Sequence, residues 1–206
     1  MKYFFSADQH FGHSNIVKYC KRLQFCTEQE KEAILKIDTI TDPQLRHKAQ
    51  RDLHLCQETV DRMNETMVNN WNALISPKDT VYFLGDLCFP KQDWQKWLDK
   101  LHGNIFWLRG NHDAKVNGRN YAPFMEVNIE GQEITLCHYA MRTWRNSCHG
   151  SIHCYGHSHG TLPPYGLSMD VGVDCHDFKP WSFEEVKVFM DERIKTMDRK
   201  TLCLVD

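Results

Sequence analysis

The sequence predicts an α/β protein with a mixed sheet, or with two sheets packed face to face between helices. Short apolar runs alternate with helical segments in the first half of the chain and cluster together in the second half. This order is typical of layered α/β folds. Almost every residue that could bind a metal directly follows one of the apolar runs. Because ligands of such sheets bind at the carboxyl ends of strands, the same runs predict a site at a sheet edge.

The first part of the chain opens with a strand and two helices. Residues 2–7 form a short aromatic strand, and residues 15–20 begin a helix. Thr27 and Glu30 have the spacing of a capping box, in which each side chain caps the backbone of the other. This pair predicts a helix over about 28–38.

A second helical segment follows Asp42 and Pro43. Asp42 is a good N-cap, and proline is favoured at the first helical position. The apolar residues behind them recur at intervals of three or four, which predicts one long amphipathic helix. They are Leu45, Ala49, Leu53, Cys56, Val60, Met63, Met67, Trp71 and Leu74.

The rest of the chain contains mostly predicted strands. Ser182 and Glu185 form a second capping box, which opens a helix over about 183–197. Another helix is expected over 91–101, where tryptophan and leucine recur at helical spacing. The expected strands cover 80–84, 104–108, 127–129 paired with 133–137 as a hairpin, 152–155, 167–173 and 201–205.

Bulk composition is that of an ordinary globular chain. Its 206 residues, 41% hydrophobic and 25% charged, suit one domain over 1–206 with a substantial core. The net charge of −2 and the lack of a basic run argue against an extended nucleic-acid surface, though not against a small nucleotide. No stretch approaches the about 18 consecutive apolar residues of a membrane span. With no signal peptide evident, we expect a cytoplasmic protein.

Nine cysteines form an odd set without a C-x-x-C pair. A disulfide framework would usually have an even number, so we expect reduced thiols packed as small hydrophobic residues. Cys137 and Cys154 lie beside site histidines, but alternation along a strand points them to the opposite face. They are therefore expected in the core.

Five clusters of candidate metal ligands follow the apolar runs. A single aspartate after a strand is often only a turn or cap residue, but a repeated pattern is harder to explain that way. Asp8 and His10 are two residues apart, which places both side chains on one face of a strand. His157 and His159 repeat this spacing, and a glycine before Asp86 lets the backbone approach an ion closely. The seven candidate ligands are Asp8, His10, Asp86, Asn111, His138, His157 and His159.

The mixture of carboxylate, imidazole and amide ligands favours Mn²⁺, Fe²⁺ or Zn²⁺ over calcium. Seven ligands exceed what one ion needs, so the pattern indicates two. Asp8 and Asp86 supply only two negative charges against the four positive charges of two divalent ions. The excess positive charge would attract hydroxide and an anionic phosphoryl group. The sequence therefore favours phosphoester hydrolysis by a metal-activated hydroxide at a dinuclear centre.

The ordered set Asp-x-His, Gly-Asp, Gly-Asn-His-Asp, His and Gly-His-x-His resembles the calcineurin-like metallophosphoesterases. Residues 8–16, 138–144 and 170–174 are similar to a small single-domain branch found in bacteria and phages. The resemblance implies two mostly mixed sheets packed face to face and flanked by helices, as four α/β/β/α layers. It also implies the cytoplasm of a bacterium, or of the host for a phage protein.

The resemblance further implies a role for each motif residue. Two divalent ions, most readily Mn²⁺ and otherwise Fe²⁺ or Zn²⁺, would be the cofactors. Asp86 would bridge them. The first ion would be held by Asp8, His10 and His159, and the second by Asn111, His138 and His157.

Four more residues are candidates for chemistry or substrate binding. The resemblance implies that His112 is the acid for the leaving oxygen, and Asp113 could orient it through a hydrogen bond. The planar fork of Arg142 suits a phosphate, although a surface ion pair is equally compatible with its position. His13 could contact substrate, or could cap or pack a helix start.

The segment at about 25–66 is longer than the corresponding segment of the branch, and we interpret it as a helical insertion. It could be a lid over the metals, or a hairpin that packs on the domain or forms a homodimer face. The expected function is a phosphodiesterase or phosphomonoesterase acting on a small nucleotide-like substrate. The alternatives are a DNA or RNA nuclease, and a non-catalytic metal-bound binding module.

Overall fold

The computed structural model describes residues 1–113 and 122–197, which contain two four-stranded sheets. The first sheet has the order β3-β2-β1-β8 and the second the order β4-β5-β6-β7. In the first sheet β1, β2 and β3 are parallel and β8 is antiparallel, whereas in the second only β4 is antiparallel. The strands are β1 (Tyr3–Ser6), β2 (Thr80–Phe83), β3 (Asn104–Trp107), β4 (Phe124–Ile129), β5 (Gln132–Cys137), β6 (Ile152–Tyr155), β7 (Ser168–Asp170) and β8 (Trp181–Ser182).

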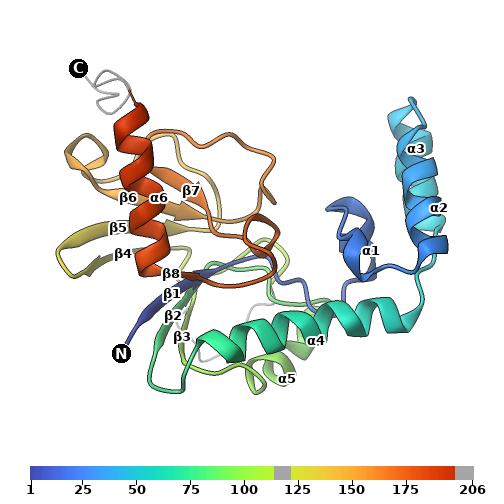
Figure 1. Cartoon of the computed structure of the whole chain (residues 1–206), viewed down its shortest axis with the longest axis horizontal. Helices are drawn as coiled ribbons and strands as arrows, with labels where there is room; N and C mark the ends of the chain where they lie inside the picture. Colours follow the sequence, from blue (N-terminus) through green and yellow to red (C-terminus); the bar gives the residue numbers. More distant parts are fainter. Residues whose placement is uncertain (114–121, 198–206) are drawn as a thin grey trace.

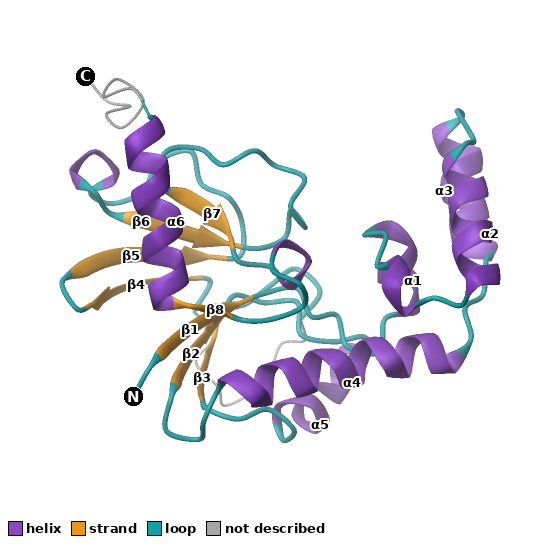
Figure 2. Ribbon diagram, viewed as in Figure 1, coloured by secondary structure: helices purple, strands orange, loops and turns teal. Residues whose placement is uncertain are grey.

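Side chains of the first sheet alternate between two cores. Phe5 and Tyr82 face a core that also contains Ile134 and Leu136 of the second sheet. Their neighbour Phe4 faces a separate core on the other side, beneath the helices. The sheets therefore pack face to face, and Figures 1 and 2 show the helices around them. The predicted fold class, two mixed sheets flanked by helices, is confirmed.

Six α-helices occur in the described part of the chain. The longest, α4, buries Met63, Met67 and Trp71 against the first sheet, and α6 packs Phe183 and Val186 on the core between the sheets. The helices are α1 (Ser14–Tyr19), α2 (Glu28–Asp38), α3 (Pro43–Asp52), α4 (Gln57–Leu74), α5 (Trp94–Leu98) and α6 (Phe183–Thr196). Short 3₁₀ turns cover Leu23–Phe25, Lys91–Asp93, Ser147–His149 and Val173–Cys175.

The prediction of one long helix from Pro43 to Leu74 is wrong. The chain is extended at Leu53 and at Cys56, which separates α3 from α4. Other groups hold the break open, because Lys18 Nζ donates to the carbonyl of Leu53 and Glu30 accepts the backbone N–H of Cys56. The apolar stripe is buried only in α4, whereas α3 has no buried residue.

The other element predictions differ mainly at their ends. The two capping-box helices begin where predicted, and the side chains of Thr27 and Ser182 both accept their N3 backbone N–H. The helix expected over 91–101 is shorter, a 3₁₀ turn followed by α5. Cys137 and Cys154 are 8% and 0% exposed, as expected for core residues. The strand expected over 201–205 lies outside the described residues.

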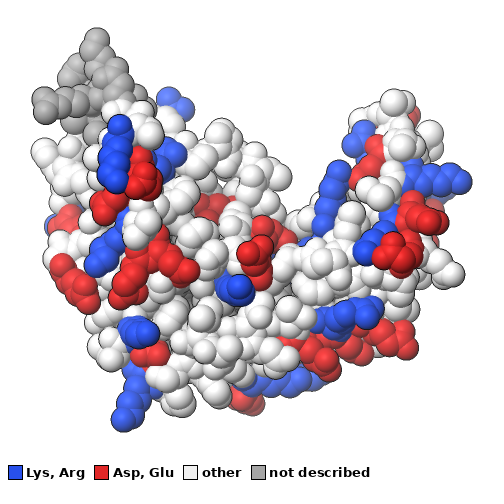
Figure 3. All heavy atoms as spheres, viewed as in Figure 1, with Lys and Arg blue, Asp and Glu red and all other residues white. Residues whose placement is uncertain are grey.

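Helices α2 and α3 project from the end of α4, and Figure 1 shows them well apart from the sheets. Figure 3 shows a hollow on this face between the α2–α3 hairpin and the body of the molecule. Whether the insertion is a lid or a dimer face stays a prediction. No helix in the described ranges has both the length and the apolar character needed to cross a membrane.

We predict that Glu30→Gln destabilises the junction of α2 with α4. The Glu30 carboxylate accepts hydrogen bonds from Thr27, from Cys56 N at 2.7 Å and from Thr59 Oγ1 at 2.6 Å. Burial raises the pKa of Glu30, but these bonds outweigh burial and lower it to about 2. Losing the charged acceptor should cost about 1–3 kcal/mol at pH 7, to be measured by urea denaturation.

The pH dependence of this difference follows from the lowered pKa. The ionised carboxylate stabilises the fold fully above pH 4.5, its ordinary pKa, and progressively less as the pH falls toward about 2. The stability gap between wild type and Glu30→Gln should therefore narrow from pH 7 to pH 3. Glu32→Gln, on an exposed position of the same helix, is the matched control. A gap that is constant with pH would contradict the assignment.

Candidate metal centre

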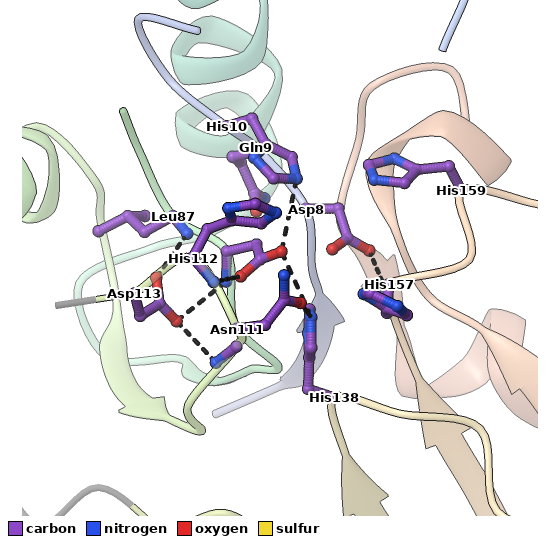
Figure 4. Close-up of polar contacts among 12 residues, drawn as sticks. Asp8, Gln9, His10, Leu87, Asn111, His112, Asp113, His138, His157 and His159 are labelled. Carbon is purple, nitrogen blue, oxygen red and sulfur yellow. Dashed lines mark hydrogen bonds and ion pairs between the residues drawn. The ribbon is translucent and has the colours of Figure 1, made fainter. Parts of the chain in front are cut away.

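All five clusters of candidate ligands reach one place because each follows a strand with a parallel neighbour. Asp8 and His10 follow β1, Asp86 follows β2, and the Asn111 loop follows β3. His138 follows β5 and the His157 loop follows β6 in the other sheet. A backbone bridge between Ala7 and Gly172 joins the two sheets at this end. Figure 4 shows the side chains of both sheets converging there.

Asp8, His10 and His159 form a first group of candidate ligands. One ligand atom from each lies within 4.8 Å of the others. Asp8 Oδ1 and His10 Nε2 are buried and make no hydrogen bond among the described residues. Buried polar atoms are nearly always satisfied, so two orphaned ligand atoms at one point indicate a missing partner. A divalent cation fits between them.

Asp86, His138 and His157 form a second group, again with ligand atoms within 4.8 Å of one another. His138 Nδ1 lies 2.8 Å from the carbonyl oxygen of Leu84, which turns Nε2 toward the site. That Nε2 is 2.9 Å from Asn111 Oδ1, and an Nε2 lone pair opposite an amide oxygen suits a shared cation. Asn111 therefore lies beside His138, the residue with which it was grouped from the sequence, and its role as a metal ligand stays a prediction.

Asp86 lies between the two groups. Its Oδ2 atom is 3.6 Å from His10 Nε2 of the first group and 3.3 Å from His138 Nε2 of the second. The other oxygen, Oδ1, accepts the backbone N–H of His112 at 2.8 Å. Asp8 is used in the same way, since its Oδ2 accepts the N–H of His157. Each carboxylate therefore fixes a neighbouring ligand loop with one oxygen and offers the other to a cation.

Two glycines allow these carboxylates to approach the backbone. A Cβ atom at Gly110 would lie 2.2 Å from Asp86 Oδ1, and one at Gly156 would lie 2.7 Å from Asp8 Oδ2. Both separations are far below van der Waals contact, so a side chain at either position would displace a candidate ligand.

Most of the candidate ligands have unusual backbone conformations. Positive φ angles are uncommon for residues with a side chain, and they concentrate at functional sites because surrounding contacts must offset their strain. The described chain has ten such residues besides glycine, and five are candidate ligands. These are Asp8 (64°), His10 (50°), Asp86 (61°), His157 (68°) and His159 (47°). Nothing in the sequence pattern signalled these conformations.

Burial and neighbouring charges set the protonation of the ligands. Burial raises the pKa of the Asp8 carboxyl to about 7. Burial also raises the pKa of Asp86, but the hydrogen bond and charge of His138 outweigh it and lower that pKa to about 2. Burial lowers the pKa of His10 well below its ordinary range, which leaves the neutral imidazole that metals bind.

His112 is exposed at the edge of the site, with its ring centroid 5.5 Å from that of His10. The hydrogen bond expected between the Asp113 carboxylate and His112 is not among the bonds that Asp113 makes in the structure. The Asp113 carboxylate accepts the backbone N–H groups of Asp86, Leu87 and Gly110 and the indole N–H of Trp107. Asp113 therefore ties the Gly85–Asp86 loop to the Gly110–Asp113 loop, because its acceptor positions are used by backbone donors.

The two predicted substrate residues lie in different settings. His13 is the N-cap residue of α1 but makes no capping hydrogen bond. Its ring packs against Phe89 at 4.9 Å, and its Nδ1 atom is buried without a partner among the described residues. Arg142 is exposed, and its guanidinium lies over the Tyr165 ring at 4.5 Å rather than in either ligand group. Their substrate roles stay predictions.

Three residues that hold the candidate ligands or their loops in place were not predicted from the sequence. Asp170 accepts a hydrogen bond from the Ser158 hydroxyl at 2.6 Å and thereby holds the loop after β6 between His157 and His159. Asp174 lies 2.7 Å from His159 Nδ1 and also pairs with Arg22. The Asp170–Asp174 stretch was part of the resemblance, but it carried no assigned role. Arg22 had no sequence signal at all.

Comparisons with known proteins relate part of this chain to a phosphoesterase family. The sequence profile of the calcineurin-like phosphoesterase family matches residues 52–149, a range that contains Asp86, Asn111, His112 and His138 but not the motifs at either end. The uncharacterized protein MJ1445 of Methanocaldococcus jannaschii is 29% identical over 193 residues, which cover 89% of this chain and 88% of that protein. The match to the family profile supports membership of the calcineurin-like superfamily and, in general terms, an activity in metal-dependent phosphoester hydrolysis.

A solved structure shares the fold. The protein of unknown function AQ665 from Aquifex aeolicus superposes with a TM-score of 0.57 at 19% identity, over 91% of this chain and 98% of that one. At this identity the likeness concerns the fold alone. The narrower prediction of a bacterial and phage branch is not confirmed, because MJ1445 is archaeal.

We predict that Asp86→Asn weakens the binding of two cations together, since one oxygen of Asp86 faces both groups. Each affinity for Mn²⁺ should fall at least about tenfold, measured by titration calorimetry and by metal analysis after gel filtration. Asp191→Asn, at an exposed position of α6, is the control. Loss of one cation with the other retained at wild-type affinity would contradict the shared role.

Proposed function

We propose that this protein is a dinuclear metal-dependent phosphoesterase that acts on a small nucleotide-like substrate. The observation that carries the proposal is the pair of ligand groups on either side of Asp86, whose Oδ2 atom faces a histidine of each. Asp8, His10 and His159 would hold one ion, and Asn111, His138 and His157 the other. Mn²⁺ is the proposed metal, with Fe²⁺ and Zn²⁺ compatible with the same ligands.

Two divalent ions supply Lewis acidity that activates water and neutralises a phosphoryl group. The chain's own residues fix the geometry for this chemistry. Asp113 links the loop after β3 to the loop after β2 by accepting the backbone N–H groups of Asp86 and Leu87, and Asp8 holds the loop after β6 by accepting the backbone N–H of His157. Each ligand group takes side chains from both sheets, so the packing of the two sheets would fix the positions of the ligands for both ions. The reacting groups are thereby oriented before substrate arrives.

His112 is the proposed general acid. Its backbone N–H is tied to Asp86 Oδ1 at 2.8 Å, so the residue is fixed beside the shared ligand while its ring stays exposed. A ring in this position can deliver a proton to the oxygen that leaves phosphorus.

Exposed aromatic side chains beside the ligands support a nucleotide-like substrate. Phe89 is 50% exposed and packs on His13, and Tyr139 is 48% exposed with its ring 4.9 Å from that of His157. Planar bases stack on such rings. Two such rings, those of Phe89 and Tyr139, could each stack on one base, which favours a small substrate over a long polynucleotide.

We predict that His112→Ala keeps both cations but lowers kcat by about 10²–10⁴-fold, the range typical of a lost general acid. Metal content and kcat would be measured on the same preparation. His149→Ala, an exposed histidine in the Ser147–His149 turn, should retain wild-type values. Full activity of His112→Ala would remove this residue from the mechanism.

The function itself is tested with Mn²⁺-loaded protein and chromogenic phosphate monoesters and diesters. We expect turnover that a chelator abolishes. A second screen would compare nucleoside monophosphates, 2′,3′- and 3′,5′-cyclic nucleotides and short oligonucleotides, with the highest kcat/KM expected for the small nucleotides. Two bound ions without turnover would favour a binding module, and a preference for oligonucleotides would favour a nuclease.

A further inference from the structure

We infer that Arg22 is a positioning residue that organises all three ligands of the first group, namely Asp8, His10 and His159. This inference deepens the proposed function and rests on it. Arg22 lies in the loop after α1, outside every motif of the metal site. Its side chain is 0% exposed, so a full positive charge lies within the protein and needs partners.

The guanidinium has two sets of partners. Nε donates to Asp174 Oδ1 and Nη2 to Asp174 Oδ2, both at 2.8 Å, in a bidentate pair. Nη2 also donates to the Asp8 carbonyl at 2.8 Å, and Nη1 donates to the Gln9 carbonyl at 3.0 Å. The guanidinium therefore forms an ion pair with Asp174 and also donates to the backbone of the loop that carries Asp8 and His10.

The ion pair orients His159. Asp174 Oδ2 is 2.7 Å from His159 Nδ1, so that nitrogen carries the proton and Nε2 is the nitrogen available to a cation with Asp8 and His10. Partners of this kind fix the tautomer and ring angle of a ligating histidine. Because both Asp174 oxygens are held by Arg22, the carboxylate cannot rotate away from the ring.

The backbone contacts stabilise the strained turn that presents Asp8 and His10. Their φ angles of 64° and 50° lie in the left-handed region, which is unfavourable for residues with a side chain and persists only where surrounding contacts hold it. The two carbonyl groups that Arg22 binds, those of Asp8 and Gln9, belong to the two peptide groups that connect Asp8 to His10. Charge-assisted hydrogen bonds to both keep the turn in the conformation that directs the two side chains into the site.

A lysine could not replace this arrangement. The contacts to Asp174, Asp8 and Gln9 use the planar fork of the guanidinium, whereas an ammonium group is a point donor. Arg22 Nη1 also lies 3.4 Å from the Met63 sulfur, and the guanidinium carbon lies 5.5 Å from the Phe178 ring centroid. Helix α4 thus packs against the guanidinium of Arg22, which gives part of the predicted helical insertion a role at the metal site.

The test compares Arg22→Lys with Arg193→Lys in the full chain. Arg193 is a matched control because it also donates to backbone carbonyls, those of Pro164 and Gly166, but not to the metal loops. Titration calorimetry with Mn²⁺ and electron paramagnetic resonance of the loaded protein report binding without relying on activity. We expect Arg22→Lys to bind one ion about 10–100-fold more weakly and to lose the spin coupling of the pair, while the second ion stays near wild-type affinity.

A second variant covers the case in which Arg22→Lys fails to fold. Arg22→Met combined with Asp174→Asn removes both buried charges together, a change that is often nearly neutral for stability, and should show the same selective loss. Either folded variant binding two ions at wild-type affinity would overturn the inference alone. A wild-type protein that binds no ions would overturn the proposed function and the inference with it.

Discussion

The positive φ angles at the strand ends are the constraint on which the rest of the site depends. Asp8, Asp86 and His157 each lie just beyond a strand with a positive φ angle, and their side chains lie in the two groups of candidate ligands at the ends of the sheets. Such left-handed turns persist only where tertiary contacts hold them, so the candidate site and the packing of the two sheets form one structural unit.

Those contacts come mostly from charged side chains that act on backbone. Asp113 binds backbone N–H groups of two loops, Asp8 binds that of His157, and Arg22 binds two carbonyls. Buried charges of this kind would be costly without partners. Here each one satisfies polar backbone that the left-handed turns leave outside the sheet ladders. The concentration of buried charge at one end of the sandwich is therefore both a cost and the means of holding the ligands.

Much of this could be predicted from sequence, and the limits have physical causes. The order of apolar runs indicated an α/β fold with one mixed sheet or two, and the family resemblance implied two. Asp8 and His10 lie together, but strand alternation is not the reason, because both residues follow β1 and have positive φ angles. Periodicity failed between Leu53 and Cys56, because tertiary hydrogen bonds from Lys18 and Glu30 interrupt a helix that local pattern alone would continue. The partners of Asp113 were also misjudged, since backbone N–H groups have no sequence signature.

The two ligand groups are supported by different parts of the chain. The second group rests on the sandwich itself, with His138 held by the Leu84 carbonyl at the end of β2. The first group depends on Arg22, whose guanidinium contacts the sulfur atoms of Met63 and Met67 of α4. Residues 57–66 of that helix lie in the segment predicted to be an insertion, so our inference gives that segment a part in supporting the site. A displacement of α4 would change the position of Arg22 and, through it, the positions of Asp174 and of the Asp8 backbone. It would therefore act on the first ligand group rather than on the second.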